Sequence, residues 1–225
     1  MAPKTEKKRN RTFVIIGLGT VGSTVATDLA RSGNHVLGID INEKSVAALS
    51  DILSEAIIAD GRDEEALREA GVDKYDVALI AIGEDLEANI LCTMNVKMLG
   101  VKTVWVKAIN KTHHRILTKL EPDRVILPEQ EIGQHIAQKL HNPAVRDYLS
   151  LGNGMHVINL EVPESMAGKT IESLDLEKSH ELRCLGILRG SEFIGCDTGT
   201  VTMEASDKIL ILGRRQNLRD FSDGI

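Results

Sequence analysis

A glycine-rich segment near the start of the chain has the spacing that binds nucleotide phosphates. Gly17-Leu18-Gly19-Thr20-Val21-Gly22 fits the pattern GxGxxG, directly after an apolar run that ends at Ile16 and before a helical pattern. The first glycine allows a tight turn, the second lets the backbone approach a pyrophosphate, and the third permits close packing of the helix. A helix N-terminus adds unpaired N–H groups and a partial positive charge. These six residues are therefore predicted to form a phosphate-binding turn.

An acidic residue follows at the distance that a ribose site requires. Asp40 ends the next β-rich run and lies 18 residues after Gly22, and Ile41 comes directly after it. A carboxylate in this place accepts hydrogen bonds from ribose hydroxyls and disfavours a 2′-phosphate, so NADP is not expected. A glycine turn made only for packing is the less favoured interpretation, because motif, strand, helix and acid coincide.

Other predicted strand ends should lie at the same crevice, because ligands bind beyond the carboxyl ends of parallel strands. They add the candidates Asp60, Gly61, Arg62, Ile82, Gly83 and Lys107. Spacing leaves open whether Lys107 reaches a nucleotide phosphate or is a solvated lysine, and the same holds for Arg62. Glu129 is either a helix-start carboxylate favoured by the helix dipole or a ligand for a hard cation; the residues alone favour the first.

Several catalytic arrangements are missing from the sequence. A dehydrogenase needs a substrate domain with a proton donor, and the residues after the long helix hold His156 and His180 without a convincing partner. There is no GxxxxGK[ST] loop, no defensible Ser/His/Asp set, and no metal-ligand spacing around His113 and His114. The nucleotide is therefore predicted to be sensed rather than consumed, with no enzymatic activity. The alternatives are an NAD-dependent oxidoreductase with a reduced substrate domain and a nucleotide- or redox-sensing transcription factor.

Amino-acid composition further limits the kind of protein this chain can be. The 225 residues are 42% hydrophobic and 27% charged, with a formal net charge of −6. This is ordinary for a globular protein and argues against nucleic acid as the main partner. No run approaches the roughly 20 apolar residues of a membrane span. Cys92, Cys184 and Cys196 form no CxxC pair and no disulfide framework, so reduced thiols are expected, with Cys92 a small core residue.

The elements that would position these residues alternate between strand and helix. Predicted strands are Thr12–Ile16, His35–Asp40, Ala56–Asp60, Val77–Ile82, Thr103–Val106 and Val125–Leu127. Predicted helices are Val21–Ser32, Glu43–Leu53, Asp63–Ala70, Leu86–Leu99 and Lys111–Leu120, with Asn42 and Asp63 at helix starts and Gly33, Gly71 and Gly100 at helix ends. The nearly continuous apolar strands indicate burial on both faces. The fold class is therefore α/β, a Rossmann-like doubly wound parallel sheet.

The pattern changes after Pro128. An amphipathic helix is predicted over Glu129–Asn142, ended or kinked by Pro143, with a flexible joint at Gly152-Asn153-Gly154. Four strands are predicted after this joint: His156–Val162, Leu182–Arg189, Glu192–Gly195 and Lys208–Gly213. A short helix is predicted over Ile171–His180, and a hairpin turn at Gly190-Ser191. This is a small α+β domain that pairing with another copy would stabilise.

The order of these motifs resembles the RCK (KTN, or TrkA-N plus TrkA-C) regulatory subunits of bacterial Ktr- and Trk-type potassium uptake systems, most of all the Ktr type. The matching segments are FVIIGLGTVGSTVATDLARSGNHVLGIDINEKSV, DKYDVALIAIGEDLEANILCTMNVKMLGVKTVWVKAIN, DRVILPEQEIGQHIAQKL, MAGKTIESLDL and ILRGSEFIGCDTGTVTMEASDKILILG. The resemblance divides the chain into a basic tail (1–11), an RCK-N domain (12–130), a crossover helix and linker (131–154) and an RCK-C domain (155–225).

The resemblance implies a ring of subunits, an octamer, on the cytoplasmic face of the membrane, where it gates an integral-membrane potassium-translocating subunit. The implied ligands are ATP or ADP, with NAD or NADH in some members. Carried onto this sequence, Gly17, Gly19 and Gly22 bind phosphate, Asp40 binds ribose and Lys107 lies near the phosphates. Glu129 falls where the Ktr type places a carboxylate that binds a divalent cation, Mg²⁺ or Ca²⁺, between two subunits.

One position departs from the family pattern. Ktr subunits usually have an arginine where this sequence has Thr20, and that arginine reaches the γ-phosphate of ATP held by a neighbouring subunit. A threonine carries no charge, so the preference for ATP over ADP must be absent here or depend on another cation, such as Arg62.

Overall fold

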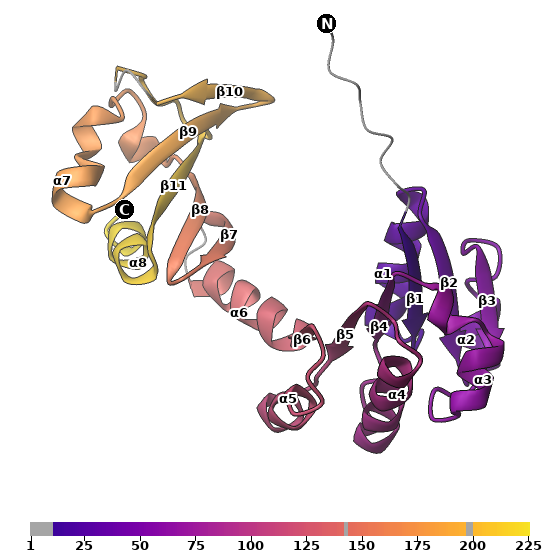
Figure 1. The fold of residues 1–225 in the computed structure, drawn as a ribbon. Coiled ribbons are helices and arrows are strands. Elements are labelled where there is room, and N and C mark those ends of the chain that lie inside the picture. Colours follow the sequence, from indigo (N-terminus) through magenta and orange to yellow (C-terminus); the bar gives the residue numbers. More distant parts are fainter. Residues whose placement is uncertain (1–10, 142–143, 197–199) are drawn as a thin grey trace, which may run out of the picture. The chain divides into compact units, whose positions relative to one another are not determined.

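The computed structural model describes residues 11–141, 144–196 and 200–225 (Figure 1). The chain divides into two compact units, the first ending at Gln130 and the second beginning at Glu131. Within the described residues, no helix has the length and apolar character to cross a membrane.

The first unit is a six-stranded parallel sheet in the order β3-β2-β1-β4-β5-β6. Its strands are β1 (Thr12–Ile16), β2 (His35–Asp40), β3 (Glu55–Ile58), β4 (Val77–Ile80), β5 (Thr103–Lys107) and β6 (Arg124–Ile126). Its helices are α1 (Thr20–Arg31), α2 (Glu43–Ala47), α3 (Glu64–Glu69), the 3-10 turn η1 (Val72–Lys74), α4 (Leu86–Met98) and α5 (Lys111–Thr118). The strand order reverses between β1 and β4, which confirms the predicted Rossmann-like doubly wound sheet.

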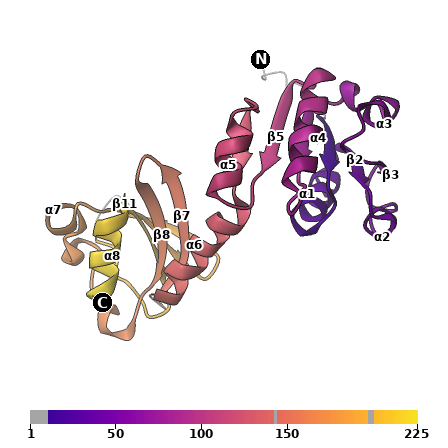
Figure 2. The ribbon, with the colours of Figure 1, turned by 90° about the horizontal axis from the view of Figure 1, so that it is seen from below.

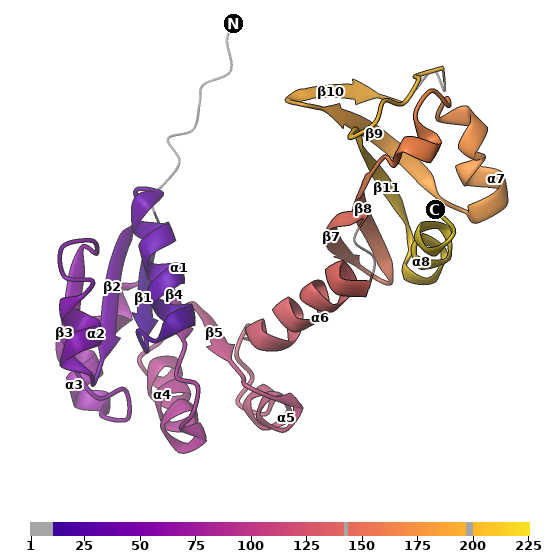
Figure 3. The same cartoon turned by 180° about the vertical axis from the view of Figure 1, so that it is seen from behind.

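Alternate residues of the strands fill two separate cores. Val14 and Ile16 of β1 pack in one cluster with residues of α3, α4 and α5, whereas Ile15 packs in another with residues of α1 and α2. Because successive strand side chains point to opposite faces, the two clusters cover opposite faces of the sheet. Figure 3 shows α1 lying along β1 and β2 on one of these faces. Burial on both faces is the reason that the strands are nearly continuous apolar runs.

Local signals fix most helix ends. Asn42 and Asp63 accept hydrogen bonds from the first backbone N–H groups of α2 and α3, as predicted. Gly33, Gly71 and Gly100 have positive φ after α1, α3 and α4. The prediction for the second helix was wrong at its end, since α2 stops at Ala47 and turns and bends follow up to residue 54. Leu49 and Leu53 are buried there, and their core spacing imitated a longer helix.

The second unit is an antiparallel sheet in the order β10-β9-β11-β8-β7. Its strands are β7 (Val145–Gly152), β8 (Met155–Glu161), β9 (Arg183–Arg189), β10 (Glu192–Gly195) and β11 (Lys208–Arg214). The other elements are α6 (Pro128–His141), which begins in the first unit, the 3-10 turns η2 (Glu164–Met166) and η3 (Glu172–Leu174), α7 (Leu176–His180) and α8 (Arg215–Asp223). Helix α8 packs on β11 and β8 (Figure 2).

The second unit differs from the sequence-based prediction in several places, beginning with β7, a strand that was not predicted. Gly152-Asn153-Gly154 is not a flexible joint but the tight turn of the β7–β8 hairpin, with positive φ at all three residues. The helix expected over Ile171–His180 is split into η3 and α7 at Asp175, whose φ is 45°. Helix α8 was not predicted, because its sequence is mostly polar and only Leu218 and Phe221 supply large buried side chains. Pro143 lies outside the described residues.

The prediction of three reduced thiols was also wrong. Cys184 of β9 and Cys196, directly after β10, form a disulfide with their Cα atoms 6.3 Å apart. The prediction rested on the absence of a CxxC pair and of a disulfide framework. Here an antiparallel hairpin brings together two cysteines that are 12 positions apart in the sequence. Cys92 of α4 is fully buried and is the small core residue that was expected.

Candidate functional site

The turn after β1 leaves the N-terminus of α1 open. Gly17 has a φ of 94°, and its N–H donates to the carbonyl of Ile39 at 2.8 Å, which sets the turn against β2. Gly19 precedes the first residue of α1 and offers no side-chain cap, and the first turn of the helix contains no acidic residue. The N–H groups at this end therefore keep their partial positive charge for an anion.

The three glycines of the motif are surrounded by different amounts of space for a side chain. A Cβ on Gly22 would collide with the carbonyl oxygen of Gly17, and a Cβ on Gly17 would lie 2.9 Å from the backbone of Ala81. A Cβ on Gly19 meets nothing within 4 Å, so it would project into the open space in front of the helix. The sequence predicted that Gly22 lets the helix approach the sheet; the tightest contact is instead with the turn itself, and the Ala81 side chain directly after β4 comes next.

Asp40 holds the turn from the side. Its Oδ2 accepts a hydrogen bond from the Leu18 N–H at 2.6 Å, and its Oδ1 accepts one from the Asn42 N–H at 2.8 Å. Each carboxylate oxygen can accept a second hydrogen bond, so the group can brace the backbone and still receive ribose hydroxyls. Ile41, beside it, has 66% of its surface exposed. An isoleucine so exposed at a strand end offers an apolar surface to a ligand.

An ion pair lies just after the end of β3, between Asp60 and Arg62. The Arg62 side chain donates from Nε and Nη2 to the Asp60 carboxylate at 3.0 and 2.7 Å, and the Arg62 backbone N–H donates to Oδ1 at 2.9 Å. The Arg62 guanidinium holds the pKa of Asp60 below its ordinary value. Asp85 and Glu87 of the α4 N-terminus add to the negative potential at Arg62. The guanidinium is thus fixed in orientation by its neighbour.

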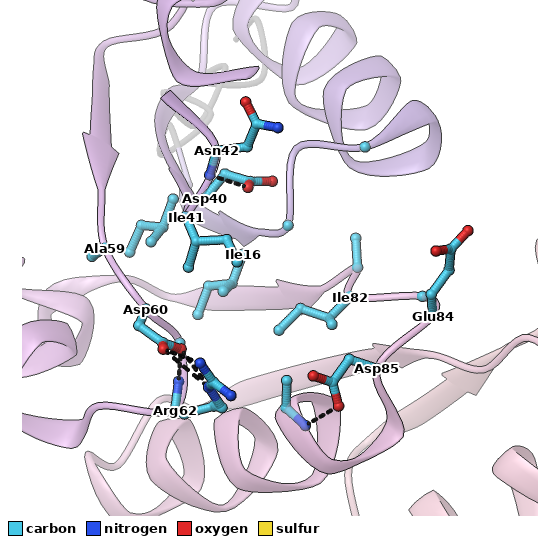
Figure 4. A pocket seen from close by; sticks show the side chains of 17 residues that line it. Ile16, Asp40, Ile41, Asn42, Ala59, Asp60, Arg62, Ile82, Glu84 and Asp85 are labelled. Carbon is cyan, nitrogen blue, oxygen red and sulfur yellow. Dashed lines mark hydrogen bonds and ion pairs between the residues drawn. The ribbon is translucent and has the colours of Figure 1, made fainter. Parts of the chain in front are cut away.

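These elements surround one pocket with a volume of about 420 Å³. It is lined by Ile16, Gly17, Gly19, Ile39, Asp40, Ile41, Asn42, Ala59, Asp60, Gly61, Arg62, Ala81, Ile82, Gly83, Glu84, Asp85 and Ala88. Figure 4 shows Asp40 and Asn42 on one side, Asp60 and Arg62 on another, and Glu84 and Asp85 opposite. The lining therefore holds four carboxylates and one guanidinium.

The structure brings most predicted site residues together. Gly17, Gly19, Asp40, Ile41, Asp60, Gly61, Arg62, Ile82 and Gly83 all line the pocket. Leu18, Thr20, Val21, Gly22, Lys107 and Glu129 do not. Leu18 is 4% exposed and belongs to the core under α1, so only its backbone N–H serves the site. Whether the gathered residues bind a nucleotide stays a prediction.

Lys107 and Glu129 bind each other. The Lys107 Nζ lies 2.6 Å from the Glu129 Oε1, and only 11% of the lysine side chain is exposed. A Cβ on Gly83 would lie 3.4 Å from that Nζ, so the ammonium passes beside a pocket residue. Partial burial acts to raise the pKa of Glu129, but the hydrogen bond from Lys107 and the other favourable contacts outweigh it, and the net shift is downward. The pair joins the end of β5 to the first turn of α6.

Sequence reasoning missed three polar residues at the site, and it gave Asn42, which also lines the pocket, only a role as a helix cap. Glu84 and Asp85 follow β4 and line the pocket, and Asp85 also caps α4 by accepting from the Ala88 N–H. Their position after an apolar strand was the available signal. Asn89 is 2% exposed, and its Nδ2 donates to the carbonyls of Ile82 at 2.6 Å and Lys107 at 3.0 Å. It fastens the ends of β4 and β5 together beneath the pocket, which no motif indicated.

The described residues contain no cluster of three or more His, Cys, Asp or Glu side chains that could hold a metal ion. Within one subunit, Glu129 would supply a single carboxylate, and that carboxylate contacts Lys107. A cation at this place would need further ligands from another subunit or from a bound nucleotide.

An open helix N-terminus, an acidic residue at the end of the second strand and a pocket at the switch point of a parallel sheet are features of the Rossmann-type fold, here followed by an antiparallel α+β unit. The TrkA-N domain model matches residues 13–128, and the TrkA-C domain model matches residues 155–223. The chain belongs to this family of RCK-type potassium uptake proteins, as its motifs indicated.

Two relatives match nearly from end to end. The chain is 37% identical to Ktr system potassium uptake protein A of Vibrio alginolyticus, over 94% of this chain and 96% of the relative. It is 32% identical to Ktr system potassium uptake protein C of Bacillus subtilis, over 93% and 95%.

Solved structures share the fold at low sequence identity. The GsuK RCK domain matches 97% of this chain with a TM-score of 0.63 and 14% identity. The GsuK channel bound to NAD matches 95% with a TM-score of 0.64 and 12% identity. The chain spans about half of the first of these solved chains and less of the second, 48% and 39%.

Proposed function

We propose that this chain is a nucleotide-sensing regulatory subunit that controls a membrane potassium channel or transporter. The observation that carries the proposal is the open N-terminus of α1 facing the pocket beside Asp40, in a chain 37% identical to a Ktr potassium uptake protein. The partner would be a separate integral-membrane potassium-translocating subunit. The chain would sit at the cytoplasmic face of the membrane through that partner.

The pocket suggests how an adenine nucleotide would be held. Its phosphates would lie at the N-terminus of α1, where the backbone N–H groups have no side-chain cap. Asp40 would accept the ribose hydroxyls while it continues to brace Leu18. The base would lie toward Ile41 and the Asp60–Arg62 pair. The proposed nucleotide-binding domain is residues 12–130, and the proposed regulatory C-terminal domain is residues 155–225.

The charges favour some nucleotides over others. Four carboxylates and one guanidinium line the pocket, and Thr20 adds no cation. Each further phosphate therefore increases the electrostatic cost of binding. NAD, NADH and ADP would bind without a divalent cation, whereas the affinity for ATP would rise more when Mg²⁺ or Ca²⁺ accompanies it. Glu129, in the first turn of α6, is the proposed cation ligand, with further ligands supplied by a neighbouring subunit.

The proposed role is sensing rather than catalysis. The 17 lining residues include no histidine, cysteine, serine, threonine, tyrosine or lysine, so carboxylates are the one kind of nucleophile or general base that the lining holds. A change in the bound nucleotide would then act by a population shift between two states of the assembly. Such a shift requires that one nucleotide bind one state better than the other.

Self-association is part of the proposal. Ile132, Ile136 and Leu140 follow each other along α6 at four-residue spacing, and their exposed fractions are 59%, 49% and 78%. Exposed apolar residues on one helix face favour burial against another copy. We propose dimers that assemble into an octameric ring.

The test is a calorimetric titration of the full chain with NAD, NADH, ADP and ATP, with and without Mg²⁺, together with light scattering. We expect saturable binding by an oligomer and no steady-state turnover of NADH with small carbonyl substrates. A monomer that binds none of the four would refute the proposal, and NADH turnover would favour an oxidoreductase.

A further inference from the structure

The disulfide of the second unit closes the open end of an edge hairpin. Cys184 lies in β9, and Cys196 follows the last residue of β10. The ladder between these strands ends in the pair Gly186 and Gly195, so both cysteines come just beyond its last rung. The bond therefore lies at the end of the hairpin away from the turn at Gly190 and Ser191.

β10 is held in the sheet through this hairpin alone. It is an edge strand, and the sheet order pairs it with β9 alone. The Phe193 ring covers Gly186 so closely that any Cβ there would collide with it, yet 59% of Phe193 remains exposed. Cys184, by contrast, is paired with Ile211 in the middle of the sheet. The bond thus ties the weakly held end of an edge strand to a well-anchored strand.

The three cysteines differ in accessibility. Cys184 and Cys196 are partly exposed and pack at the margin of the second core. Cys92 is fully buried in the first core, and burial raises the pKa of its thiol. A small reagent in water can therefore reach the pair, while Cys92 is protected until the first unit unfolds.

We propose that Cys184 and Cys196 form a reversible thiol–disulfide site whose reaction partners are low-molecular-weight disulfides and thiols. One cysteine thiolate attacks the disulfide RSSR, which forms a mixed disulfide and releases one RS⁻. The second thiolate attacks the protein sulfur of that mixed disulfide, forms the Cys184–Cys196 bond and releases the second RS⁻. In sum, two cysteine thiols and RSSR give one protein disulfide and two RSH, and excess thiol reverses the reaction.

The proposal extends beyond nucleotide sensing. A cytoplasmic compartment keeps most thiols reduced, so a disulfide in such a protein is typically transient and redox-sensing. The bond closes a loop of the hairpin and stabilises it against opening. Oxidation would therefore order β10, and reduction would loosen it, without any change at the pocket of the first unit.

The experiment is mass-spectrometric thiol mapping of the full wild-type chain, equilibrated with glutathione and glutathione disulfide at several ratios and then alkylated without denaturant. We expect a Cys184–Cys196 peptide in oxidising buffer, alkylation of both residues in reducing buffer, and a reversible transition between them. Cys92 is the internal control and should be alkylated only after unfolding. A pair that stays alkylatable in excess glutathione disulfide, or one that resists reduction in the native protein, would overturn the proposal.

A second measurement does not depend on any variant folding. Hydrogen exchange of the wild-type backbone over β9 and β10 should slow at least several-fold on oxidation, and the second unit should melt about 10 °C higher. The variant Cys196→Ser should show neither change. Equal exchange in both redox states would contradict the inference, and nucleotide titration of the same samples tests the proposed function separately.

Discussion

Two charged side chains that line the pocket already make structural hydrogen bonds. Asp40 accepts two backbone N–H groups and keeps acceptor capacity on the side of the pocket. Arg62 is fixed by Asp60, so it presents a positive charge of defined orientation among carboxylates. The sequence indicated both residues, but only the structure shows that Arg62 is already paired. Its charge is therefore partly neutralised before any phosphate arrives.

Arg62 should influence highly charged nucleotides more than weakly charged ones. In Arg62→Ala the lining loses its one cation, and we expect ATP affinity to fall about tenfold, but NAD affinity by only about twofold. Paired calorimetric titrations measure this difference. Arg68→Ala is the matched control, because Arg68 also pairs with a carboxylate, Glu64, but does not line the pocket. An equal loss for both nucleotides would contradict an electrostatic role.

At the scale of elements, the first unit was largely predictable and the second only partly. β1 and β2 match their predicted bounds, because strands buried on both faces give long apolar runs. β7 escaped notice since it is an edge strand with mostly exposed residues next to two glycines. Asn89 could not have been assigned either. Its partners are two backbone carbonyls that only the folded sheet brings together.

Asn89 should support both stability and the shape of the pocket. Asn89→Leu keeps the side-chain size but leaves two buried carbonyls without their donor, so we expect a loss of about 2 kcal/mol in the free energy of unfolding. Nucleotide affinity should fall as well, because Ile82 and Gly83 line the pocket. Chemical denaturation and titration provide the two measurements.

The control for Asn89 lies one turn further along α4. Thr93→Val removes a hydroxyl that donates to the backbone carbonyl of Asn89 at 2.7 Å. It should lower stability by less than about 1 kcal/mol and leave nucleotide affinity unchanged. If Thr93→Val weakened nucleotide binding as much as Asn89→Leu, general damage to α4 would explain both.

At the scale of the whole molecule, the first unit is followed by α6, a helix that begins in it and continues into the second unit. The Lys107–Glu129 pair fastens the first turn of this helix to the end of β5. The ion pair thus ties the first turn of α6 to a strand end that lies beside the pocket residue Gly83. The family of the chain was predictable from the order of its motifs. The Lys107–Glu129 pair was not, because residue spacing does not determine which carboxylate a flexible lysine side chain contacts.

Glu129→Gln tests the proposed cation role. The amide keeps an oxygen ligand but loses the negative charge of the carboxylate, which weakens binding of a divalent cation, so we expect any effect of Mg²⁺ or Ca²⁺ on assembly to disappear at concentrations that act on the wild type. Affinity for NAD should be unchanged within about twofold, since Glu129 does not line the pocket. Light scattering with and without the cation provides the readout. A variant that keeps the wild-type cation response would place the ligand elsewhere.

The most direct test of nucleotide binding compares two aspartates of the first unit. In Asp40→Ala the pocket loses its proposed ribose acceptor and the brace of Leu18, and in Asp51→Ala an exposed carboxylate outside the pocket is removed. The measurement is a calorimetric titration of both folded variants and the wild type with ADP and with NAD. We predict at least about tenfold weaker binding of both nucleotides by Asp40→Ala and wild-type binding by Asp51→Ala. Unchanged affinity in Asp40→Ala would contradict the account.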